Sequence, residues 1–192
     1  YIFNQEDTEA VQLRKKLRKD LKCNSFKWFL ENITPEVVVP SEDAVFFGQL
    51  RNVQSRFCLT VNESTQILQF DFCTLFGRNQ VFAITKSHVV KHDSLCIMPD
   101  DSQGGVELVK CDESSKLMKW NYDHLSSTLN DFTLKLIGVD QRKPYGVLES
   151  QGTGSCMGKE GIHMNSTLSM QPCDYGNPLQ YWIFTHRLND RR

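Results

Sequence analysis

The sequence lacks features that define several functional classes. It has no run of about 18 uncharged apolar residues, so we expect no membrane-spanning helix within these 192 residues. Neither sign of charge is in excess, because the formal net charge is −1, and this argues against nucleic-acid binding through the whole surface. No G-x-S-x-G motif and no matched serine, histidine and aspartate grouping stands out. We therefore expect no catalytic residue in this chain.

Cysteine, by contrast, is plentiful, with seven residues. Six of them fall into three pairs whose members are 15, 15 and 17 residues apart: Cys58 and Cys73, Cys96 and Cys111, Cys156 and Cys173. Zinc ligands typically stand about two to four residues apart, so the spacing disfavours a metal site. It favours disulfides within each pair and an oxidising compartment, although other connectivities remain open. Cys23 is left over.

Two further candidate sites are weak. His88 and His92 share a strand face and could hold a metal with Asp93, but surface histidines on a strand are commoner, and we predict no metal site. The glycine-rich stretch 152–159 invites comparison with a phosphate loop. It has Thr153 and Glu160 where that pattern requires glycine and a hydroxyl residue, so a turn is the better interpretation.

The cysteine pairs belong to an internal repeat. Nine residues beyond each second cysteine stands an aromatic residue, namely Phe82, Trp120 and Trp182. Gln80, Met118 and Gln180 precede these aromatics by two positions. The units span residues 48–85, 86–122 and 146–184, and their alternating runs and glycine turns predict short strands. Because such a unit cannot bury its apolar face alone, we predict an all-β fold, a β-trefoil with the three aromatics in its core.

The segment before the repeats has a different composition. Apolar residues at partly helical spacing over residues 9–31 predict an α-helical segment that ends before Pro35. Residues 10–27 carry seven basic side chains and one acidic side chain. A phosphate or membrane surface could bind such a segment, but a solvated helix face whose apolar stripe packs on a neighbour is favoured. Residues 36–45 are predicted to be a linker.

The motif Lys22-Cys23-Asn24-Ser25-Phe26-Lys27-Trp28-Phe29, with Leu13–Leu17 before it and Leu30–Glu36 after it, closely resembles the end of the catalytic domain of polypeptide N-acetylgalactosaminyltransferases. These Golgi enzymes start mucin-type O-glycosylation. In that family a linker and a ricin B-type (R-type) lectin β-trefoil follow. The resemblance implies three parts: the helical end of a catalytic domain at 1–35, a linker at 36–45 and the lectin at 46–186.

The resemblance also implies a parent protein anchored in the Golgi membrane, with this chain in the Golgi lumen and without direct membrane contact. The anchor, and a catalytic domain that binds manganese and UDP-GalNAc, would precede Tyr1. No cofactor is implied for this chain. The cysteine that matches Cys23 is bonded to the catalytic domain in relatives, so that domain is an expected partner.

In R-type lectins each repeat builds a sugar site from an aspartate, an aromatic residue and an asparagine. The matching positions here are Thr60, Met98 and Gly158 for the aspartate, Asp71, Val109 and Gln171 for the aromatic residue, and Asn79, Leu117 and Leu179 for the asparagine. Only Asn79 keeps the family residue. Asp71, beside Phe70 and Phe72, could relocate the carboxylate. The candidate sugar-binding residues are therefore Asn79, Asp71 and Thr60.

The expected function is binding: recognition of GalNAc on glycopeptides, which directs a tethered catalytic domain to further acceptor residues. The alternative is a degenerate lectin that serves as a structural or protein-contact module, even of an inactive transferase. The tail motif argues against a free-standing trefoil of the cytokine or inhibitor kind. Asn32, Asn62 and Asn165 begin N-glycosylation sequons. An insertion between Asn121 and Tyr145 contains a strand-like run at 132–137.

Overall fold

The computed structural model describes residues 9–34, 37–74, 77–100, 102, 104–123 and 145–188. It divides into two compact units, Tyr1–Val39 and Pro40–Arg192, whose boundary falls within the predicted linker. Among the described helices, none is long and apolar enough to cross a membrane. The strand-like run at 132–137 lies outside the described residues.

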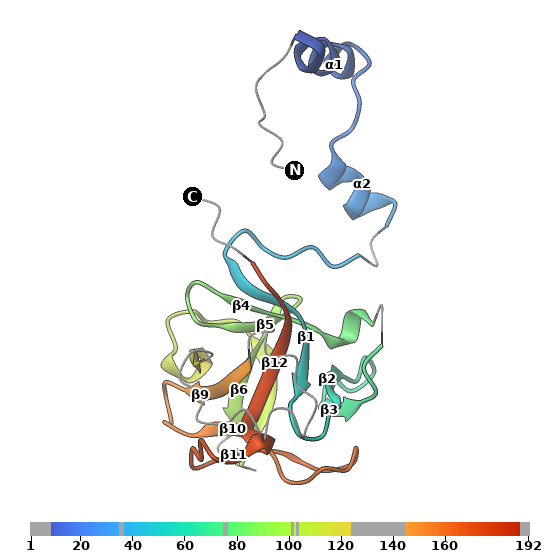
Figure 1. Cartoon of the computed structure of the whole chain (residues 1–192). Coiled ribbons are helices and arrows are strands. Elements are labelled where there is room, and N and C mark those ends of the chain that lie inside the picture. The colour runs from blue at the N-terminus through green and yellow to red at the C-terminus, as the bar shows by residue number, and fades with distance from the viewer. Residues whose placement is uncertain are drawn as a thin grey trace. The chain divides into compact units, whose positions relative to one another are not determined.

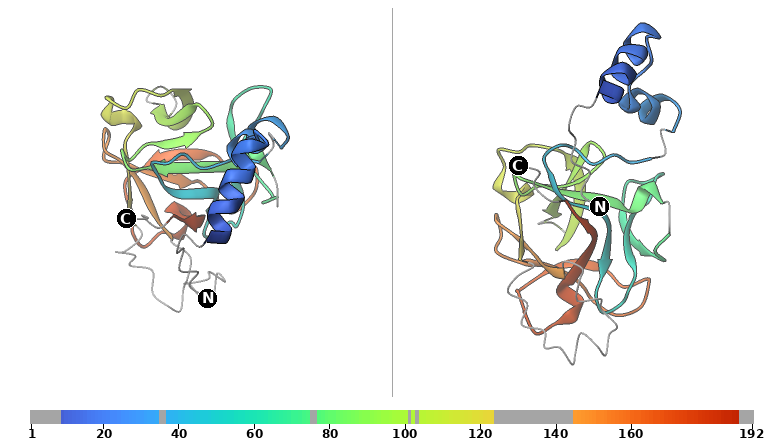
Figure 2. Two further views of the ribbon diagram at one scale, coloured as in Figure 1. Left: turned by 90° about the horizontal axis from the view of Figure 1, so that it is seen from above. Right: turned by 45° about the horizontal axis from the view of Figure 1, so that its top comes forward.

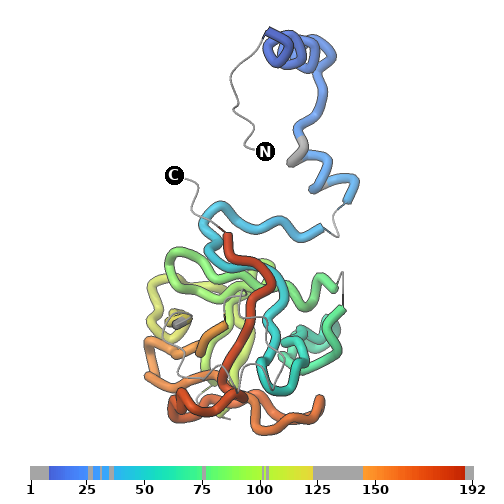
Figure 3. The backbone as a smooth tube through the Cα atoms, in the orientation of Figure 1, coloured from blue at the N-terminus to red at the C-terminus, as the bar shows by residue number. Residues whose placement is uncertain are grey.

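The first unit contains two helices, α1 (Glu9–Asp20) and α2 (Phe26–Asn32), where the sequence predicted one continuous helical segment (Figure 3). The chain leaves α1 through Lys22, which has a left-handed φ of 49°, and the amide of Cys23 donates to the carbonyl of Arg18 at 3.0 Å. Ser25 then caps α2, since its hydroxyl accepts from the amide of Trp28 at 3.0 Å. Local capping chemistry therefore interrupts the helix.

The second unit is built from strands. They are β1 (Ala44–Asn52), β2 (Cys58–Val61), β3 (Leu68–Asp71), β4 (Val81–Thr85), β5 (Val90–His92), β6 (Leu95–Asp100), β7 (Gly105–Lys110), β8 (Trp120–Asp123), β9 (Tyr145–Ser150), β10 (Cys156–Lys159), β11 (Leu168–Gln171) and β12 (Tyr181–Arg187). A one-turn 3-10 helix precedes the last strand of each repeat: η1 (Arg78–Gln80), η2 (Lys116–Met118) and η3 (Pro178–Gln180). Each predicted repeat thus supplies four strands.

Six of these strands form a barrel, which is viewed from two further directions in Figure 2. β1 pairs with both β12 and β4, β4 pairs with β5, and β8–β9 and β9–β12 continue the sheet (Figure 1). A bridge between Val89 and Lys119 joins the β5 and β8 segments and completes the circuit. The hairpins β2–β3, β6–β7 and β10–β11 extend from it. The predicted all-β trefoil is confirmed.

Equivalent positions of the three repeats meet in the core. Leu59, Ile97 and Met157, each following the first cysteine of its repeat, are at most 1% exposed. The three repeat aromatics, Phe82, Trp120 and Trp182, are 0% exposed. Residues of this size dominate core energetics, so the repeat aromatics stabilise the fold and are not available as binding groups.

Three disulfides join Cys58 to Cys73, Cys96 to Cys111 and Cys156 to Cys173, the pairings that the spacing favours. Beside each disulfide, the residue two positions before the repeat aromatic accepts a main-chain hydrogen bond. Gln80 Oε1 accepts from the amide of Thr74 at 2.9 Å, and Gln180 Oε1 accepts from that of Asp174 at 2.8 Å. In the second repeat the sulfur of Met118 lies 3.0 Å from the amide of Asp112. These residues hold the chain after the second cysteine.

Candidate functional site

The first predicted sugar-site residue, Thr60, lies inside the second unit. It is 3% exposed, and its hydroxyl donates to the carbonyl of Cys58 at 3.2 Å. The same oxygen accepts from Nε2 of Gln80 at 3.0 Å. Because this hydroxyl is buried and already donates its one proton within the fold, Thr60 is a poor ligand group for a sugar.

Asp71 and Asn79 occupy separate environments. Asp71 ends β3 opposite Cys58, and its Oδ1 accepts from the amide of Phe72 at 2.7 Å. Asn79 lies in η1, and its side chain lines a pocket whose lining includes neither Thr60 nor Asp71. The structure therefore does not bring the three candidates together in this pocket.

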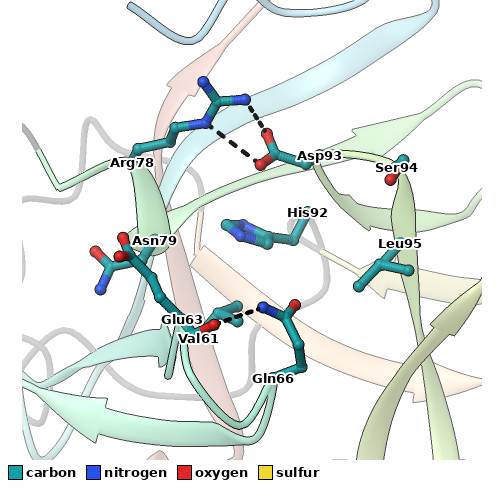
Figure 4. A pocket seen from close by; sticks show the side chains of 9 residues that line it. All are labelled: Val61, Glu63, Gln66, Arg78, Asn79, His92, Asp93, Ser94 and Leu95. Carbon is teal, nitrogen blue, oxygen red and sulfur yellow. Dashed lines mark hydrogen bonds and ion pairs between the residues drawn. The ribbon is translucent and has the colours of Figure 1, made fainter. Parts of the chain in front are cut away.

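The pocket has a volume of about 320 Å³ and lies between the first and second repeats (Figure 4). Small-molecule sites typically occupy about 300–1,000 Å³, so its size suits a small ligand. Its walls come from the β2–β3 turn, from η1 and from the β5–β6 turn. The lining residues are Val61, Glu63, Gln66, Arg78, Asn79, His92, Asp93, Ser94 and Leu95.

An ion pair connects two walls of the pocket. Arg78 Nε lies 3.3 Å from Asp93 Oδ2, and Arg78 Nη2 lies 3.2 Å from Asp93 Oδ1. Both side chains are substantially exposed, so the pair contributes at most about 1 kcal/mol to stability. Its main consequence is that the two charges offset each other, which leaves Glu63 as the remaining charged side chain among those that line the pocket.

His92 differs most from its sequence-based interpretation. It is 7% exposed, not a surface residue, and its ring lies 5.2 Å from that of Phe82, centroid to centroid. Its Nδ1 lies 2.9 Å from the carbonyl of Val81. His88 precedes β5 in a turn with φ of 67°, so the two histidines do not share a strand face. No group of three metal-ligating side chains occurs among the described residues.

In the other two repeats, neighbouring side chains pack closely around the predicted sugar-site positions. Met98 and Val109 contact an apolar cluster of Val89, Cys96 and Met118. At Gly158, an added Cβ would lie 3.1 Å from side-chain atoms of both Gln171 and Gln180. The positions that match Asn79 hold Leu117 and Leu179, so neither of these repeats keeps the asparagine amide.

Comparisons with known proteins agree with this architecture. Residues 46–144, about half of the chain, match the ricin-type beta-trefoil lectin domain family. Polypeptide N-acetylgalactosaminyltransferase 5 of Caenorhabditis elegans is 31% identical over 186 residues, which are 93% of this chain and 26% of that protein. The rat protein of the same name is 30% identical over 178 residues, 93% of this chain and 17% of that protein. The chain thus spans about a quarter or less of these relatives.

Solved structures show the same fold. The crystal structure of GalNAc-T7 with UDP, GalNAc and Mn2+ superposes with a TM-score of 0.60 at 19% identity, covering 93% of this chain and 30% of that one. The hemolytic lectin CEL-III superposes with a TM-score of 0.58 at 19% identity, covering 77% of this chain and 32% of that one. The chain belongs to the ricin-type β-trefoil lectin family, and its relatives are polypeptide N-acetylgalactosaminyltransferases.

Proposed function

We propose that this chain is the carbohydrate-binding module of a polypeptide N-acetylgalactosaminyltransferase and that it recognises GalNAc on glycopeptide acceptors. The observation that carries the proposal is Asn79: the family asparagine of the first repeat lines a polar pocket of about 320 Å³. A module of this kind would hold a partly glycosylated acceptor near the catalytic domain. Even a weak site acts at roughly millimolar effective concentration when it is tethered.

The parent protein is part of the same proposal. We place it in the Golgi membrane with this chain in the lumen, and with manganese and UDP-GalNAc bound by its catalytic domain and not by this chain. Cys23 is exposed and forms no disulfide with the described cysteines. This agrees with a bond from Cys23 to the catalytic domain, which would make that domain the second partner of the lectin.

A titration of the whole chain tests the proposal. Calorimetry or NMR would be run with GalNAc, with a GalNAc-bearing glycopeptide and with the same peptide unglycosylated. We expect binding in the millimolar range or tighter for the first two ligands and none for the third, and Asn79→Ala should weaken it about tenfold, the effect of one or two lost hydrogen bonds.

A structural or protein-contact role is the alternative, because packing fills the sugar positions of the second and third repeats. Absence of binding to GalNAc and to the glycopeptide at millimolar concentrations would reject the lectin function and leave this role. Asp71→Ala should change binding only if the carboxylate of Asp71 contacts the sugar.

A further inference from the structure

We infer that His92 and Glu63 bind the sugar of the first repeat in the pocket between the first two repeats. The sugar does not bind at a site around Thr60 and Asp71. The inference deepens the proposed function and rests on it. The ligand class is a neutral pyranose, for which GalNAc is the probe.

The first argument compares the three junctions between repeats. Each junction has one residue from the end of a repeat and one from the start of the next. The first stands directly before Gln80, Met118 or Gln180, and is Asn79, Leu117 or Leu179. The second stands four residues before the first cysteine of a repeat, and is His92, Gly152 or Gln54. At the second junction Leu117 lies so close to Gly152 that an added Cβ would be 2.6 Å from Leu117 Cδ2. At the first junction Asn79 and His92 line the pocket. Leu117 at the second junction therefore fills a space that is open and polar beside Asn79 at the first.

The second argument is the state of His92, which is more than nine-tenths buried yet lines the pocket (Figure 4). The carbonyl of Val81 can only accept, so Nδ1 of His92 carries the proton and donates to it. In the neutral ring Nε2 is then an acceptor, and within the described part of the chain it has no hydrogen-bond partner. A buried ring that is held on one side by Val81 and Phe82 presents this acceptor in a fixed position.

The remaining polar groups complement hydroxyl groups. Gln66 Nε2 donates to the carbonyl of Glu63 at 3.1 Å, which fixes the β2–β3 turn and leaves the Gln66 amide oxygen as an acceptor. Glu63 adds a carboxylate, and Asn79 adds an amide. Such acceptors bind the hydroxyl groups of a sugar, and charge-assisted bonds to a carboxylate are the stronger ones.

The charge and the apolar surface of the pocket further restrict the class of ligand that it can bind. Because Arg78 and Asp93 offset each other, the carboxylate of Glu63 makes the pocket unfavourable for an anionic sugar. Leu95, which is half-buried, contributes apolar surface, against which the C–H face of a pyranose can pack. The combination fits a neutral sugar better than sialic acid or a phosphate.

The experiment is an NMR titration of the ¹⁵N-labelled whole chain with GalNAc, with N-acetylneuraminic acid as the anionic comparison. We expect GalNAc to shift the amides of Glu63, Gln66, Asn79 and His92–Leu95, and the acidic sugar to shift none of them. His92→Phe keeps a ring on Phe82 and removes Nε2, while Glu63→Gln removes the charge. Each should weaken binding about tenfold. Glu107→Gln, on the exposed part of β7, is the matched control and should leave the Kd unchanged.

The outcomes separate the two proposals. If wild-type chain binds GalNAc but the shifts cluster at Thr60 and Asp71 or in another repeat, and His92→Phe and Glu63→Gln bind normally, the inference is wrong and the lectin function stands. If no resonance shifts at millimolar GalNAc, the inference is rejected, and the lectin function is rejected with it when the GalNAc-bearing glycopeptide also fails to bind. Asn79→Leu, which copies the leucine of the other repeats, checks that a folded variant with a filled pocket loses binding.

Discussion

The indole nitrogen of Trp182 donates a hydrogen bond to the main-chain carbonyl of Met157 at 2.8 Å. Trp120 makes the equivalent bond to Ile97 at 3.0 Å. Both links span a repeat, from its last strand to the residue after its first cysteine. The first repeat has Phe82 at this position, which has no donor, and the ring of His92 packs against it instead. The departure of the first repeat from the tryptophan pattern is thus connected with the position of His92.

Removing either indole should therefore destabilise the fold. We expect Trp182→Phe to lower the free energy of unfolding by about 2–4 kcal/mol, because it removes a buried hydrogen bond and leaves space in the core. Denaturant unfolding measures this. Trp28→Phe, which changes a 40% exposed tryptophan in α2, should stay within about 0.5 kcal/mol of wild type. Equal midpoints for wild type and Trp182→Phe would contradict the assigned role of the indole.

Gly48 is a second sensitive position. Its φ of +111° is accessible almost only to glycine, and an added Cβ would overlap the hydroxyl oxygen of Thr185, which accepts a hydrogen bond from the amide of Gln49. We expect Gly48→Ala to lower the free energy of unfolding by about 3 kcal/mol or more. Gly154→Ala is the control: φ is +68° but nothing lies within 4 Å, so the loss should be about 1 kcal/mol. Similar losses of unfolding free energy at both positions would show that the close approach of Thr185 to Gly48 does not matter for stability.

From the burial of Lys159 we predict an unusual dependence of stability on pH. The side chain is 0% exposed, its ammonium lies 4.6 Å from the ring centre of Phe70, and its Nζ donates to the carbonyls of Gly161 and His163. Burial lowers the pKa of Lys159 below the ordinary lysine value. Between the lowered pKa and the ordinary value of about 10.4, the unfolded chain binds more protons than the folded chain, so this group's contribution to stability rises with pH.

The comparison with Lys159→Met isolates this effect from other titrating groups. We expect the free energy of unfolding of wild type, relative to Lys159→Met, to increase between about pH 7 and about pH 10. Urea unfolding at several pH values measures the difference. A relative stability that stays constant or decreases over this range would show that the carbonyl and ring contacts outweigh the cost of burial.

The three sequons should differ in glycan occupancy after secretion. Asn165 is exposed in the β10–β11 connection. Asn32 Nδ2 donates to the carbonyl of Trp28 at 2.8 Å, and Asn62 Oδ1 accepts from the amides of Ser64 and Thr65. Because the amide nitrogen carries the glycan, we expect the highest occupancy at Asn165 and the lowest at Asn32. Glycopeptide mapping of wild type and Asn165→Gln checks this, and a glycan at Asn32 with Asn165 unmodified would refute it.

Regular intervals along the chain were sufficient to predict the architecture. The cysteine pairs and the aromatics at 82, 120 and 182 recur three times, and three copies of a short-stranded unit that cannot bury its own apolar face indicate a trefoil. These intervals lie within single repeats, so they can be counted without knowing the fold. The interruption between α1 and α2 is also local, but it depends on Lys22 adopting φ of 49° and on the cap by Ser25, which the apolar spacing alone does not report.

The pocket depended on tertiary structure. Its walls come from the turn that carries Gln66 in the first repeat and the turn that carries Asp93 in the second, which only the folded chain brings together. His92 packs against Phe82 across the pairing of β4 with β5, and packing of the third repeat on the first places Lys159 over Phe70. Neither burial is visible in the sequence, because the exposure of a polar side chain depends on what packs on it from distant segments. The sequence alone determined the repeat, the disulfide spacing and the family, whereas packing between repeats decided which polar groups line the pocket.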